Sequence, residues 1–251
     1  MTVLRVYWGG YFKSPVTLDM VPSEVDTVIL AFIGPLNNKV ETTFLCSKYP
    51  EEQIKAWVKE IQNRGIKVLM SILDTPQTHW NIVNMEEFGK SVKQVAIDEW
   101  GCDGVDIDAE SGMPSQDYIK CFIELIQTCR KNIGPDKIIT YTCYVGTGPY
   151  DGHILSATHN IIDGLQLMAY FDDFDAMTAL FNNYKTVVGE NKIAIGVKAP
   201  TTPLHEVKRL CLWNPNKAGM MLWTLNRDCE EFTGMSDFTW IFEIIDNLFP
   251  L

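Results

Sequence analysis

The stretch Asp103-Gly104-Val105-Asp106-Ile107-Asp108-Ala109-Glu110 decides the fold, because it has the pattern of a buried strand and carries a cluster of acids. Acidic and apolar residues alternate in it with a period of two. Alternate side chains of a strand point to opposite faces, so Asp106, Asp108 and Glu110 share one face. The other face is apolar and suits packing against helices. Three carboxylates at one strand end repel one another, so we expect a raised pKa and a shared proton.

A carboxyl group that stays protonated near neutral pH can act as a general acid, which makes acid/base catalysis the favoured interpretation of this strand. Two alternatives stay open at this point. Carboxylate oxygens also suit Mg²⁺ or Ca²⁺, and the stretch could be an acidic edge strand with a structural role. An edge strand does not explain Gly104 or the strictly apolar partners of the acids.

Short apolar runs alternate with amphipathic segments along the rest of the chain, which predicts a parallel sheet covered by helices. Eight such runs in 251 residues favour a single (β/α)8 TIM barrel spanning residues 1–251. An open doubly wound sheet is the competitor, but Trp8-Gly9-Gly10-Tyr11 after the first strand is not the expected GxGxxG. The predicted strands are Val3–Trp8, Thr27–Ile33, Lys67–Ile72, Gly104–Asp108, Ile138–Tyr144, Gly164–Tyr170, Ile193–Lys198 and Met220–Leu225.

The helical segments differ in how clearly they show an amphipathic pattern. Residues 51–64 place Ile54, Val58 and Ile61 on one stripe, whereas the first strand-to-helix segment and residues 150–157 are poorly patterned. We therefore expect one or more short or irregular barrel helices. Ser115 is a candidate N-cap for the helix that follows the acidic stretch.

Composition narrows the function classes. Hydrophobic residues make up 46% and charged residues 21% of the chain, which is typical of a globular protein. The net charge of −11 disfavours nucleic acid and anionic membranes as partners, because phosphate contacts need clustered Lys and Arg. We expect a monomer, and no cofactor is expected. The seven scattered cysteines show no CxxC pair, which predicts reduced, mostly buried thiols. The N-terminus fits a cytoplasmic protein or a mature secreted form equally well.

The acidic stretch resembles the DxxDxDxE signature of family 18 glycoside hydrolases, which include chitinases and endo-β-N-acetylglucosaminidases. Other segments agree in order: residues 66–71 resemble the family's third strand, which ends in a serine, and Leu222-Trp223 resembles the tryptophan of the eighth strand. Gln166-Leu167-Met168-Ala169-Tyr170 resembles the sixth strand with its MxY element. The similarity spans about residues 3–225 and implies a (β/α)8 barrel.

The resemblance also implies a mechanism. Glu110 would protonate the glycosidic oxygen and later activate water. The 2-acetamido oxygen of the substrate would attack C1, a substrate-assisted route with net retention. Asp108 would orient the acetamido group, and Asp106 would share a proton with Asp108. Tyr170 would donate a hydrogen bond to the acetamido group.

Further residues are assigned to the substrate by the same resemblance. Trp223 would form the floor under the distorted sugar, and Ser71 would support Asp106 from a neighbouring strand. Met168, Gln166 and Tyr7 are further candidates for the binding site. Asp172 is another, although the sequence Tyr170-Phe171-Asp172-Asp173 displaces the family's aspartate by one position. Trp8, Tyr11, Trp80 and Tyr144 are candidates for lining a cleft.

Three functions remain open from the sequence. The many aromatic residues and the MxY element favour an enzyme that cuts chitin or chitooligosaccharides. The chain lacks room for the insertion that deepens the cleft of some chitinases, which implies an open groove and an endo-acting enzyme. Ser71-Ile72-Leu73, which replaces the Ser-x-Gly-Gly of chitinases, favours an endo-β-N-acetylglucosaminidase acting on the N-glycan core. A chitin-binding lectin on the same barrel is the third, and the retained Glu110 argues against it.

Overall fold

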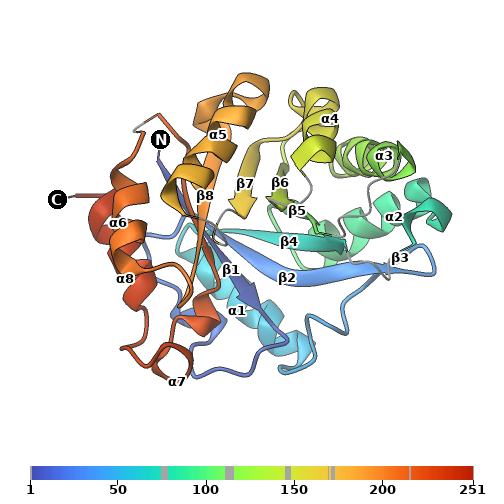
Figure 1. Ribbon diagram of the computed structural model, residues 1–251. Helices are drawn as coiled ribbons and strands as arrows, with labels where there is room; N and C mark the ends of the chain where they lie inside the picture. The colour runs from blue at the N-terminus through green and yellow to red at the C-terminus, as the bar shows by residue number, and fades with distance from the viewer. Residues whose placement is uncertain are drawn as a thin grey trace.

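The protein is a closed barrel of eight parallel strands surrounded by helices, as predicted (Figure 1). This computed structural model describes residues 2–74, 79–110, 116–144, 148–168, 170, 173–214 and 216–250. β1 pairs in parallel with both β2 and β9, which closes the barrel. The barrel strands are β1 (Val3–Gly9), β2 (Thr27–Leu36), β4 (Lys67–Asp74), β5 (Gly104–Ala109), β6 (Ile138–Tyr144), β7 (Gly164–Met168), β8 (Ile193–Lys198) and β9 (Gly219–Trp223).

The helices include the irregular ones that the sequence predicts. The connection from β1 to β2 holds only the 3₁₀ turn Leu18–Met20 among its helical elements, and α2 continues into the π-helical turn Lys93–Glu99. α7 is a four-residue helix. Ser115, the candidate cap before α3, lies outside the described residues. The helices are α1 (Glu51–Asn63), α2 (Met85–Val92), α3 (Gln116–Ile133), α4 (Gly148–Thr158), α5 (Phe174–Val188), α6 (Leu204–Leu212), α7 (Glu230–Thr233) and α8 (Thr239–Leu248).

Six of the eight predicted strands end at a different residue. β1, β4 and β5 extend by one or two residues, to Gly9, Asp74 and Ala109. β2 continues to Leu36 because its last residues pair with the antiparallel strand β3 (Lys39–Glu41), which forms a hairpin beyond the barrel rim. β7 ends at Met168 rather than Tyr170. β9 ends at Trp223, because residues Leu225–Arg227 form a 3₁₀ turn instead of extended strand.

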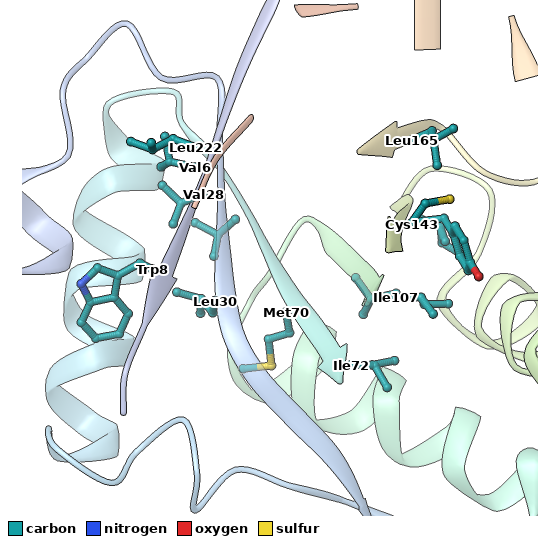
Figure 2. Close-up of a cluster of buried hydrophobic side chains, with 14 of the residues drawn as sticks. Val6, Trp8, Val28, Leu30, Met70, Ile72, Ile107, Cys143, Leu165 and Leu222 are labelled. Carbon is teal, nitrogen blue, oxygen red and sulfur yellow. The ribbon is translucent and has the colours of Figure 1, made fainter. Parts of the chain in front are cut away.

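The barrel strands separate two apolar clusters. The larger one lies between strands and helices, and Figure 2 shows part of it with Val6, Val28 and Leu30. Trp8 belongs to this outer cluster and stacks edge-on against Trp57 of α1, so the expectation that it lines a cleft is wrong. The period of two explains the error, since Tyr7 is the residue of that pair that faces inward. The smaller cluster fills the barrel around Tyr7.

The cysteines are free and mostly buried, as the sequence predicts. All seven cysteines are free, and Cys102, Cys129, Cys143, Cys211 and Cys229 are buried. Within the described ranges, no helix has the length and apolar character needed to cross a membrane.

Asp103 anchors the entry of β5 and does not reach the barrel mouth. Its carboxylate accepts hydrogen bonds from the backbone N–H of Val68, the side chain of Gln62 and the ammonium of Lys67. Asp103 is thus a structural residue of the motif. Asp103 therefore helps to set the register of β4 against β5, on which the position of the other acids depends.

Asp228 fastens α8 to the barrel from a distant loop. Its fully buried carboxylate accepts the backbone N–H groups of Trp240 and Ile241 in the first turn of that helix. Burial raises the pKa of Asp228 to about 6, against the effect of these hydrogen bonds. The folded protein therefore binds this proton more tightly than the unfolded chain does.

We predict that this group makes stability depend on pH with a defined sign. Its contribution is fully present below pH 4 and is lost as the pH rises through 6, because the pKa is raised on folding. The change amounts to about 3 kcal/mol for a shift of about two pKa units. Urea unfolding of wild type and Asp228→Asn at pH 4 and pH 7 should therefore give a stability difference that favours wild type more at pH 4. Asp246→Asn, at an exposed position of α8, is the control, and an equal difference at both pH values would contradict the prediction.

Candidate active site

Asp106 is the centre of a polar network inside the barrel. Its carboxylate is fully buried and accepts five hydrogen bonds that arrive from four other strands of the barrel. Oδ2 accepts from the hydroxyls of Tyr7 and Ser71, each at 2.7 Å. The donors to Oδ1 are Thr140 at 2.6 Å, Thr142 at 3.0 Å and Gln166 at 3.1 Å.

This arrangement suits an ionised carboxylate. Burial raises the pKa of Asp106, and the surrounding hydroxyl donors oppose that shift. An ionised carboxylate only accepts, at about four lone-pair sites. A protonated carboxyl group has an O–H donor of its own, which would need an acceptor among the surrounding groups. The five donors therefore favour the charged form of Asp106. Tyr7 stays protonated, because burial and the nearby Asp106 and Asp108 carboxylates raise its pKa well above the usual value.

An aromatic floor lies beside the network. Trp223 is partly exposed at the end of β9, and its ring centroid lies 5.2 Å from that of Tyr7. Phe32 stacks on Trp223 with centroids 5.6 Å apart and planes inclined by 20°. Met168 and the buried Tyr170 belong to the same inner cluster. The rings thus offer one apolar face toward the mouth of the barrel.

Asp108 and Glu110 continue the line of acids toward the barrel mouth. Asp108 is buried, with only 1% of its surface exposed, whereas Glu110 follows the last residue of β5 and is exposed. Alternate residues of a strand lie about 6.6 Å apart, so the three carboxylates rise from the interior to the surface. The Glu110 charge acts on two groups across the mouth, the Tyr11 hydroxyl and the Lys198 ammonium.

Lys198 is a site residue that the sequence reasoning missed. It ends β8 on the inward face, and its ammonium lies 5.6 Å from the centre of the Tyr170 ring. Burial lowers the pKa of Lys198, and Arg227 acts in the same direction while Glu110 opposes it. The signal was present, because the predicted strand 193–198 places Lys198 at the end where barrel sites form.

A row of stacked rings leads from the floor to the surface. Tyr11 stacks on Phe32 with centroids 6.0 Å apart and on Phe44 with centroids 4.3 Å apart. Phe44 is 49% exposed, and it lines a pocket of about 310 Å³ together with Phe32 and Leu73. The hairpin of β2 and β3 supplies Leu36 and Glu41 to the same pocket.

The structure gathers most of the residues that the resemblance singled out. Ser71, Tyr7 and Gln166 contact Asp106 directly, while Tyr170, Met168 and Trp223 line the barrel above it. Gln166 is fully buried beside Asp106. Trp80 packs outside the barrel against Phe88 and Phe122.

Two of the expected positions fall outside the described part of the chain. Asp172 lies outside the described residues, as does the side chain of Tyr144. Asp173 is described, and its carboxylate caps α5 by accepting the backbone N–H of Ala176. In the described part of the chain, no group of three or more His, Cys, Asp or Glu side chains is placed to hold a metal ion.

Comparison with known proteins identifies the family. The sequence model described as the TIM-barrel domain of the endo-beta-N-acetylglucosaminidase EndoS matches residues 9–203, well over half of the chain. The chain belongs to this family. It is thus a barrel of glycoside hydrolase family 18, as the acidic motif predicts. No curated protein matches the sequence.

Solved structures agree with the barrel. A family 18 chitinase from Pseudoalteromonas aurantia is 19% identical, with a TM-score of 0.78 over 98% of this chain and 100% of that one. A chitinase from Bacteroides thetaiotaomicron is 12% identical, with a TM-score of 0.81 over 99% of this chain and 97% of its own. An endo-beta-N-acetylglucosaminidase mutant from Cordyceps militaris, in complex with fucosyl-N-acetylglucosamine-Asn, is 16% identical, with a TM-score of 0.72 over 99% of this chain and 91% of its own. At these identities the likeness concerns the fold.

We predict that Asp106→Asn destabilises this family 18 barrel by roughly 1–3 kcal/mol, although it removes a buried charge. The asparagine amide would present N–H groups to hydroxyl and amide donors that now meet a carboxylate oxygen. Urea unfolding at pH 7 measures the change, with Asp98→Asn on the exposed helix surface as the control. A variant as stable as wild type would show that the network does not require an ionised acceptor.

Proposed function

We propose that the protein hydrolyses β-1,4 linkages of N-acetylglucosamine units with retention, by substrate-assisted catalysis. The observation that carries the proposal is the line of Asp106, Asp108 and Glu110 on β5, buried at one end and exposed at the other. No second carboxylate is needed as a nucleophile when the substrate's own acetamido oxygen attacks C1.

Each residue has a role that its position supports. Glu110 is exposed at the mouth and protonates the glycosidic oxygen, then activates the water that opens the intermediate. Asp108 lies one step deeper and holds the acetamido N–H, which stabilises the positive charge that develops beside it. Asp106 supplies a fixed negative charge below Asp108. Tyr170 donates to the acetamido group, and the Trp223 ring supports the distorted sugar.

Chitooligosaccharides are the substrate that the aromatic row favours. The rings of Phe32, Tyr11 and Phe44 continue outward from Trp223, and sugar rings present apolar faces of matching size. The exposed Phe44 would contact a unit beyond the one that reacts. A chain bound across several units is cut internally, which is the endo-acting mode.

The N-glycan core is the second candidate, and the family comparison favours it. The matched family is named for an endo-beta-N-acetylglucosaminidase, and the Cordyceps militaris mutant holds fucosyl-N-acetylglucosamine-Asn. The core contains the same β-1,4 bond between two N-acetylglucosamine units, so the chemistry at Glu110 is unchanged. The groove beyond the reacting unit would distinguish the two substrates.

We predict cleavage of at least one of two substrates: chitooligosaccharides or a high-mannose glycopeptide. Mass spectrometry of the products distinguishes shortened oligosaccharides from a peptide that keeps one N-acetylglucosamine. Both products would carry the β-anomeric configuration at the new reducing end, as net retention requires. Binding without cleavage of either substrate would overturn the catalytic proposal in favour of a lectin.

Glu110→Gln is the matched variant for that experiment. It preserves size and exposure but has no proton to donate at the barrel mouth. Turnover should fall by about 10²–10⁴-fold while substrate binding persists. Glu231→Gln, at an exposed position of α7, serves as the control for loss of one surface charge. Wild-type turnover in Glu110→Gln would contradict the assignment of the acid.

We predict that Phe44→Ala weakens binding of long substrates selectively. Loss of one stacking ring should raise KM for a hexasaccharide by about three- to tenfold, because an aromatic contact contributes about 0.5–1.5 kcal/mol. A disaccharide substrate that fills only the sites nearest Glu110 should show little change. Phe242→Ala, at a similarly exposed ring on α8, is the control. Equal effects on both substrates would place Phe44 outside the binding row.

A further inference from the structure

A buried arginine lies at the base of the barrel, below the acidic network. Arg5 stands two residues before Tyr7 on the inward face of β1, and only 9% of its surface is exposed. Its Nη1 donates a hydrogen bond of 2.9 Å to Oε1 of Gln166 on β7. Gly164 makes room for it, because a Cβ at that position would lie 2.6 Å from Nη2.

This contact fixes which way the Gln166 amide points. A glutamine side chain can present either its carbonyl oxygen or its NH₂ group to a neighbour, whereas an arginine only donates. The carbonyl oxygen must therefore face Arg5. The NH₂ group then faces the other way, where Nε2 lies 3.1 Å from Oδ1 of Asp106 and 3.3 Å from Oγ1 of Thr142.

We propose that Arg5 is a positioning residue for the catalytic acids. Through Gln166 it holds a permanent N–H donor against Asp106, which keeps that carboxylate an ionised acceptor beneath Asp108. The inference deepens the proposed function and rests on it. The other donors to Asp106 are hydroxyls, which can rotate and become acceptors. The Gln166 amide cannot do so as long as Arg5 holds its carbonyl oxygen.

The charges around Arg5 support this role. Burial lowers the pKa of Arg5, while the Asp106, Tyr7, Asp26 and Asp163 groups raise it. Two of these acids are engaged elsewhere at the barrel base. Asp26 accepts the backbone N–H of Leu4, and Asp163 pairs with Arg130 at 2.6 Å. Guanidinium groups stay protonated in proteins, so Arg5 brings a fixed positive charge beneath Asp106.

The remaining charged groups near the network lie on its other side. Asp108 stands above Asp106 on β5, Glu110 follows the last residue of that strand, and Lys198 stands at the mouth on β8. Ser71, Thr140, Thr142 and Gln166, which reach Asp106 from β4, β6 and β7, carry no charge. Arg5 is therefore the cation at the buried end of the line of acids, and no ion pair within the described ranges engages it in place of Gln166.

A purely structural role does not explain why this buried residue is an arginine. Burying a guanidinium is unfavourable unless its hydrogen bonds are met, and an apolar side chain of similar length would fill the space at the barrel base. A filler would also leave the Gln166 amide free to turn. The arginine, with the glycine that leaves room for it, instead fixes the orientation of Gln166.

The test compares Arg5→Met with wild type over a range of pH. Met keeps the length of the side chain but donates no hydrogen bond and carries no charge. We expect kcat to fall about tenfold or more and KM to change less than twofold, because the effect reaches the substrate only through the acids. The acid limb of the pH profile of kcat should move upward by about one pH unit, since Asp106 then holds a proton more readily. Arg209→Met, on the surface of α6, is the control.

Arg5→Lys and Gln166→Glu keep the proposal testable if Arg5→Met folds poorly. Lysine retains a donor for Oε1 and should preserve most of kcat and the position of the acid limb. Glutamate removes the N–H donor and places a second carboxylate beside Asp106, so it should lower kcat and move the acid limb as Arg5→Met does. Lower thermal stability with unchanged kcat and pH profile in these variants would overturn the proposal and leave Arg5 a structural residue.

A readout without turnover separates this inference from the proposed function. ¹³C NMR of aspartate carboxyl carbons follows the titration of Asp106 directly, with Asp106→Asn identifying its resonance. The titration midpoint should be higher in Gln166→Glu than in wild type, whichever substrate the enzyme cleaves. An unchanged midpoint would contradict the role of Arg5 and Gln166, whereas a wild-type protein that cleaves neither substrate would contradict the proposed function alone.

Discussion

The buried carboxylate of Asp106 is the constraint on which the barrel interior depends. It sits on β5 and receives hydrogen bonds from β1, β4, β6 and β7, so five of the eight strands meet at one charged group. A buried charge is tolerated only where donors surround it, and removing one partner leaves an expensive unpaired group. The relative register of these strands is therefore fixed by chemistry as well as by packing. The same register places Asp108 and Glu110 above it.

The outward faces of the strands stabilise the fold, and the inward faces carry the candidate site. Outward residues such as Val6, Val28 and Leu30 pack against the helices and supply the apolar burial that closes the barrel (Figure 2). The inward face is relieved of much of that task and accommodates hydroxyls, an amide and an arginine. This division explains why β5 reads as a regular alternation while its inward side is almost entirely acidic.

The sequence predicts the parts of this protein that depend on periodicity within one strand. β6 and β8 have the predicted bounds, and alternation along β5 puts Asp106 and Asp108 on the inward face. Contacts between strands are different, because they depend on register that no single segment reveals. The Arg5–Gln166 pair joins residues 161 positions apart. The hairpin at the end of β2 was missed for the same reason, since it is defined by its pairing with β3.

The barrel mouth combines acids with cations in a chain of strongly negative net charge. Lys198 and Arg227 both act on this region, and the Arg227 guanidinium lies 4.2 Å above the ring of Phe12. An uncharged sugar gains little from cations as direct partners, so their value lies in the field they set. Glu110 and Lys198 interact across the mouth, because the Glu110 charge opposes the lowering of the Lys198 pKa by burial. In the proposed mechanism one carboxyl donates a proton and then recovers it, and Glu110 is the exposed acid of the motif, with Asp108 buried below it and Lys198 across the mouth.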